Sequence, residues 1–64
     1  MALTEAQKLV RDLDTLAAST REDWADLTTK RLSADDRARI MEHLDWCLTE
    51  MMRLKDRLTE LGSD

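Results

Sequence analysis

The second half of the chain carries apolar residues at alternating steps of four and three. This spacing places its members on one face of an α-helix, and it continues for about three heptads without a break. Ser33 precedes the series as an expected N-cap, and Gly62 follows it, where a left-handed C-cap is expected. We therefore predict a helix over about residues 34–61. Its apolar seam is Ile40, Leu44, Cys47, Met51, Leu54, Leu58 and Leu61.

The first half repeats the pattern less regularly. Thr4 and Gln7 have the spacing of a capping box, which marks a helix start. Two neighbouring columns of side chains then form a wide apolar stripe, as a core-facing helix requires. The first column turns polar at Asp23. A helix is therefore predicted over about residues 4–29. The columns are Ala6, Leu9, Leu13, Leu16, Thr20 and Leu27, and Leu3, Val10, Ala17 and Trp24.

The junction between the two patterns contains neither Gly nor Pro. Thr28 and Thr29 are β-branched and weak helix formers, while Lys30 and Arg31 complement the negative end of a helix dipole. We place the turn at about residues 30–33. Two helices of similar length joined by so short a connection form an antiparallel hairpin.

A hairpin with stripes this wide leaves much apolar surface in water. Soluble monomers rarely expose such a surface, and each buried Leu contributes about 1.5–3 kcal/mol. The predicted fold is therefore all-α, an antiparallel two-helix hairpin that dimerises into a four-helix bundle. The expected dimer core is Leu9, Leu13, Leu16, Trp24, Leu27, Ile40, Leu44, Cys47, Met51, Leu54 and Leu58.

Composition narrows the possible functions. The chain has 64 residues, a formal net charge of −4, one Cys and no Pro. So short a chain makes a single domain, residues 1–64, and cannot readily enclose a catalytic pocket, so we predict a non-enzyme without a cofactor. The lone Cys47, the absence of a membrane-spanning apolar run and an N-terminus unlike a signal peptide favour a cytoplasmic protein.

The stretch that leads from the turn into the second predicted helix has a distinctive set of residues, which are Leu32, Ala34, Asp35, Ala38, Ile40, Glu42, Leu44, Glu50 and Arg53. At this spacing, without a gap, it resembles the Rop-like family of plasmid copy-number proteins, which are helical hairpins of nearly the same length. The resemblance covers about a third of the chain. It implies a homodimeric four-helix bundle that binds paired RNA hairpins.

A looser likeness is to the small Rop-like proteins encoded beside nitrogen-fixation genes. It rests on Asp23, Asp26 and Leu27, followed by the run 39–42, Arg-Ile-Met-Glu. Trp24 stands where that family has a Leu, and the family's Pro-containing turn is missing.

RNA binding does not transfer from the resemblance residue by residue. The Rop-like RNA face on the first helix carries an essential aromatic, whereas the corresponding stretch here has none and includes the acidic Asp14. The basic residues are interleaved with acids, which is typical of a solvated helix surface. Fold likeness alone is a poor guide to function, so RNA binding is retained only as the alternative.

Trp46 lies off the apolar seam and is expected on the outward surface. An exposed Trp often anchors a protein interface, and Met is common at adaptable binding surfaces. We therefore predict a small accessory or adaptor protein that binds a protein partner through Trp46, Met52, His43 and Arg53. No membrane contact is expected.

His43 and Cys47 lie four residues apart, with Glu50 one turn further along. Two such His-Cys pairs meeting across a dimer axis could form a tetrahedral zinc site. The simpler interpretation makes Cys47 a small hydrophobic seam residue with His43 beside it. The sequence alone therefore leads us to predict no metal.

Overall fold

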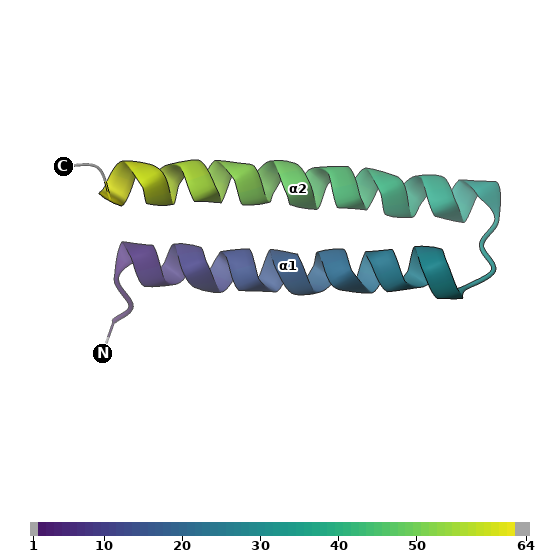
Figure 1. The fold of residues 1–64 in the computed structure, drawn as a ribbon, viewed down its shortest axis with the longest axis horizontal. Helices are drawn as coiled ribbons and strands as arrows, with labels where there is room; N and C mark the ends of the chain where they lie inside the picture. Colours follow the sequence, from purple (N-terminus) through teal and green to yellow (C-terminus); the bar gives the residue numbers. More distant parts are fainter. Residues whose placement is uncertain (1, 63–64) are drawn as a thin grey trace.

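The computed structural model describes residues 2–62, which form two helices. Helix α1 spans Glu5–Thr29 and helix α2 spans Ala34–Gly62. The helices run antiparallel and side by side, so the beginning of α1 and the end of α2 lie at the same end of the molecule (Figure 1). The predicted all-α architecture with a two-helix hairpin is confirmed.

The start of α1 is set by a complete capping box. The Gln7 backbone N–H donates to Thr4 Oγ1 at 3.1 Å, and the Thr4 backbone N–H donates to Gln7 Oε1 at 2.9 Å. These two bonds satisfy donors that the first turn of a helix otherwise leaves without a partner. The local sequence therefore determines where α1 begins.

The short connection between the helices is bounded by a cap at the end of α1 and a cap at the start of α2. Lys30 is the C-cap of α1, where its backbone N–H donates to the Asp26 carbonyl and its Nζ lies 3.1 Å from Asp26 Oδ1. At the start of α2, Ser33 Oγ accepts a hydrogen bond from the Asp36 backbone N–H at 3.1 Å. Ser33 thus serves as the predicted N-cap.

Gly62 does not adopt the left-handed C-cap that we expected. It is the last residue of α2, and no glycine in the part of the chain that the structure describes has a positive φ. Glycine permits a left-handed turn at the end of a helix but does not require one. Here the right-handed helical backbone continues through Gly62.

The interior of the hairpin is narrow. Leu44, Cys47 and Leu54 on α2 are buried, whereas α1 has no buried residue. The other α2 seam residues and most of the first α1 column are half-buried, except Ala6 and Leu61, which are exposed. Two helices alone therefore cover only the centre of the predicted apolar stripe.

A helix that crosses a bilayer needs about 20 consecutive, predominantly apolar residues. Neither α1 nor α2 contains an apolar stretch able to cross a membrane. This agrees with the charged residues that interrupt both helices at short intervals.

Candidate functional site

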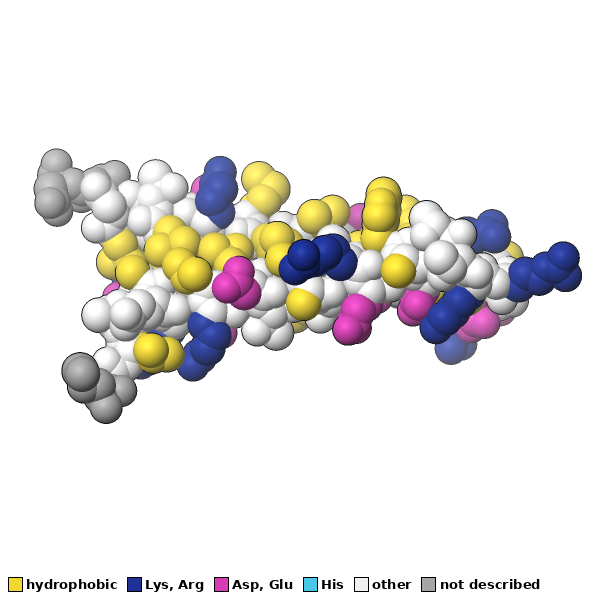
Figure 2. All heavy atoms as spheres, turned by 60° about the horizontal axis from the view of Figure 1, so that its bottom comes forward, with side chains coloured by type: hydrophobic (Ala, Val, Ile, Leu, Met, Phe, Trp, Pro, Cys, Tyr) yellow, Lys and Arg dark blue, Asp and Glu magenta, His cyan; other side chains and the backbone are white. Residues whose placement is uncertain are grey.

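One side of the hairpin presents a row of exposed apolar side chains, which we call the apolar face. α1 contributes residues spaced by a multiple of seven, which lie on one side of a helix beside its seam, and α2 contributes side chains on the corresponding side of its own seam. Hydrophobic side chains gather in a band over the junction of the helices, broken by a few charged side chains (Figure 2). The apolar face comprises Val10, Trp24, Met41, Leu48 and Met52, all of them exposed.

Two shallow grooves show that both helices build this face. One groove lies between Trp24 and Thr20 of α1 and Leu48 of α2. The next lies between Leu13 of α1 and Leu48 and Met52 of α2. Leu48 borders both grooves and is 50% exposed, which makes it the central residue of the apolar face.

The opposite side of the hairpin, which we call the polar face, is crossed by ion pairs. Arg57 of α2 donates to Glu5 of α1 at 2.9 Å and to Glu60 at 3.1 Å. The hydrogen bond to Glu5, the hydrogen bond to Glu60 and both negative charges raise the pKa of Arg57 above its ordinary value. Arg53 forms an i,i+3 ion pair with Glu50 at 2.7 Å.

Trp46 is the large apolar side chain of the polar face, and 56% of it is exposed. It borders a groove between the helices together with Leu16 of α1 and Arg53 of α2. Its ring stacks on the His43 imidazole, with ring centroids 6.2 Å apart and an interplanar angle of 23°. One ring face of Trp46 is thus held by a neighbour while much of the side chain meets solvent.

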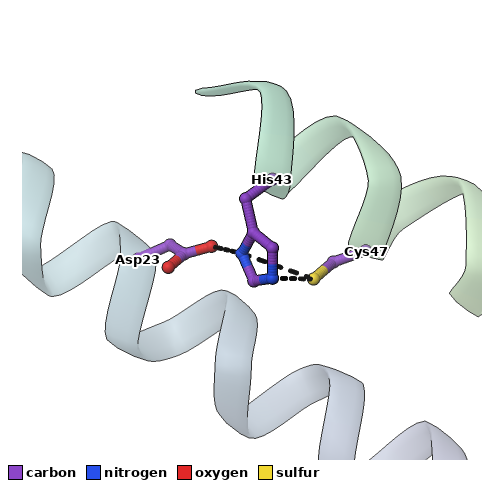
Figure 3. Close-up of side chains that lie close together, drawn as sticks. All are labelled: Asp23, His43 and Cys47. Atoms are coloured by element: carbon purple, nitrogen blue, oxygen red, sulfur yellow. Dashed lines mark hydrogen bonds and ion pairs between the residues drawn. The ribbon is translucent and has the colours of Figure 1, made fainter. Parts of the chain in front are cut away.

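A cluster of three potential metal ligands lies between the helices beside this stack. The Asp23 carboxylate of α1 contacts His43 Nδ1, and Cys47 Sγ lies 3.9 Å from Nδ1 and 3.8 Å from Nε2 of the same ring (Figure 3). One donor atom from each residue lies within 4.8 Å of the other two. The cluster therefore offers carboxylate, imidazole and thiol to one point.

The four residues predicted to bind a partner do not all lie on one face of the hairpin. Trp46, His43 and Arg53 adjoin on the polar face, whereas Met52 lies on the apolar face beside Leu13. Trp24, predicted in the dimer core, is outside the hairpin interior and 61% exposed. Its place in a dimer stays a prediction.

Asp23 was not predicted from the sequence to lie beside His43 and Cys47. A signal was present, because Asp23 occupies a position of the apolar column where a Leu or Ala would be expected. What the sequence lacked was the register of α1 against α2, which decides that Asp23 lies opposite His43. Glu50, one turn beyond Cys47 on α2, is not part of the cluster and pairs with Arg53.

Comparison with known proteins gave no match to a family model, to a curated protein or to a solved structure. The two faces and the ligand cluster are therefore the features of the hairpin that bear on its function.

Proposed function

We propose that the protein is a non-enzymatic adaptor that pairs with a second copy of itself through the apolar face and binds a partner protein through the polar face. The observation that carries the proposal is the segregation of exposed side chains. Leu48 and Trp24 lie on one side of the hairpin, and Trp46 lies on the other. One surface is thus available for self-association while another remains free.

The solvent-accessible surface area of the hairpin supports the pairing of two copies. A compact monomer of 7.4 kDa has an accessible surface of about 4,200 Å². The hairpin exposes 5259 Å², about 1,000 Å² more than that expectation. A standard interface buries about 800 Å² on each partner. A symmetric contact along the apolar face would remove an excess of this size and form a four-helix bundle.

The partner surface is the neighbourhood of Trp46. Interface hot spots are enriched in Trp and Arg and need surrounding groups that exclude water. Trp46 and Arg53 share one groove, and His43 supports the indole ring by stacking. The charged side chains around them would set the rate and specificity of association more than its affinity.

Self-association is tested first, by sedimentation equilibrium on freshly reduced protein over a range of concentrations. The expected result is a monomer–dimer equilibrium. A species that remains monomeric at every concentration would refute the pairing and leave the apolar face without its proposed occupant.

Partner binding is tested by affinity capture with the wild-type chain and with Trp46→Ala. We expect the variant to lose a specific captured protein while its circular dichroism and dimer mass stay unchanged. The matched control is Met52→Ala on the apolar face, which should keep the captured protein. Retention of structured RNA with a steep dependence on salt would instead support the RNA-binding alternative.

A further inference from the structure

We propose that Asp23, His43 and Cys47 form a binding site for one divalent transition metal ion of the zinc class. The three residues supply a carboxylate oxygen, an imidazole nitrogen and a thiolate sulfur. Zinc binds all three donor types and commonly takes three protein ligands with water in the fourth position. The thiolate and imidazole also disfavour magnesium and calcium, which prefer oxygen ligands.

The spacing of the donor atoms fits such an ion. With zinc–ligand bonds of about 2.0–2.3 Å, tetrahedral ligands lie roughly 3.3–3.6 Å apart. Cys47 Sγ lies 3.9 Å from Nδ1 and 3.8 Å from Nε2 of His43, so sulfur and ring must approach by a few tenths of an ångström and the ring must turn until one nitrogen lone pair points at the shared ion. The Asp23 carboxylate, which contacts Nδ1, must move away from it to make room for the ion.

The position of Asp23 is the second reason for the proposal. Its side chain is only 16% exposed, at a place in the α1 seam where apolar residues are the rule. Holding a carboxylate between two helices carries a desolvation cost unless an opposite charge or hydrogen-bond donor compensates it. His43 already partners this carboxylate in the hairpin. A metal ion would add a full opposite charge at the same place, and it would link α1 to α2 through one bond from Asp23 and two from α2.

The site is complete within one chain. All three ligands belong to the same hairpin, and His43, which is 49% exposed, provides the route by which an ion enters. The cluster adjoins the stacked pair of His43 and Trp46 on the polar face, away from Leu48. The stoichiometry is therefore one ion per chain, and it does not depend on self-association through the apolar face.

Cobalt(II) is the probe, because it accepts the same ligands and gives a thiolate-to-metal charge-transfer absorption. Metal-stripped, reduced protein is titrated with cobalt and then with zinc. We expect the charge-transfer absorption to saturate at one cobalt per chain, to be accompanied by release of the Cys47 proton, and to disappear as zinc displaces cobalt. Cys47→Ser removes the sulfur and should abolish this absorption.

His43→Gln and Asp23→Asn test the other two ligands. Because His43 is half-exposed, its substitution should leave the helical circular dichroism unchanged while weakening cobalt binding by roughly tenfold or more. Asp23→Asn should weaken binding similarly. Asp26→Asn is the matched control, since Asp26 lies on α1 and pairs with Lys30 instead of the cluster. Its affinity should equal that of the wild type.

Three results would overturn the proposal. The first is the absence of any charge-transfer absorption at excess cobalt, which would make the cluster only an ion pair beside a buried thiol. The second is cobalt binding that His43→Gln leaves unchanged. The third is saturation at half an ion per chain, which would mean that two chains share the ion through His43 and Cys47.

Discussion

Leu48→Ala is the most direct test of how the hairpin associates. Leu48 borders both grooves of the apolar face, and half of its side chain is exposed in the single hairpin. In a symmetric dimer each copy contributes one Leu48, so a single substitution removes two apolar side chains from the interface.

The size of the effect follows from burial. Burying a whole Leu side chain contributes about 1.5–3 kcal/mol, and the hairpin already covers half of Leu48. The half that a second copy would cover is therefore worth about 1 kcal/mol per chain, or about 2 kcal/mol per dimer. Because 1.4 kcal/mol changes an equilibrium constant tenfold, the dimer dissociation constant should rise roughly thirtyfold.

Sedimentation equilibrium of the wild type, Leu48→Ala and Trp46→Ala measures this difference. Trp46 is exposed to a similar extent but lies on the polar face, so its substitution should leave the dissociation constant unchanged. An unchanged constant for Leu48→Ala together with a weakened Trp46→Ala dimer would refute the reasoning, because it would place self-association on the polar face.

Further predictions concern stability and are measured by urea unfolding at fixed protein concentration. Leu54→Ala, in the hairpin interior, should lower the free energy of unfolding by about 2–5 kcal/mol. Thr4→Ala removes the capping box of α1 and should cost about 1 kcal/mol. The pKa of Arg57 is raised in the folded state, so its pairs with Glu5 and Glu60 stabilise the protein below the ordinary arginine pKa. This contribution should disappear as the pH rises into strongly alkaline solution, and Arg57→Met should remove that alkaline dependence.

The ends of the helices were readable from the sequence because they are governed by local chemistry. Thr4 and Ser33 cap the helices that follow them, and their partners Gln7 and Asp36 lie three residues away. Such interactions require no knowledge of the rest of the molecule. Gly62 marks the limit of this reasoning, since glycine permits a left-handed cap without requiring one.

The candidate site was less predictable because it depends on contacts between the helices. Asp23 and His43 are 20 positions apart, and their contact follows from the register of α1 against α2. Trp46 and Met52 lie on different faces of the hairpin for another reason. Residues six apart on an ideal helix are rotated by about 240°, so neighbours along the exposed side of α2 reach opposite faces of the hairpin. The apolar seam alone does not tell on which side of it an exposed residue such as Trp46 or Met52 lies.

The geometry divides the predicted partner-binding residues between the two faces of the hairpin. A second copy on the apolar face would cover Met52 and Leu48, whereas it would leave Trp46 and His43 in solvent. His43 then belongs to two arrangements, because its ring stacks on Trp46 and its Nδ1 contacts Asp23. An ion bound at this nitrogen would hold the ring against which Trp46 rests. Metal occupancy would therefore pre-organise the proposed partner surface without touching the dimer interface, and self-association would proceed without metal.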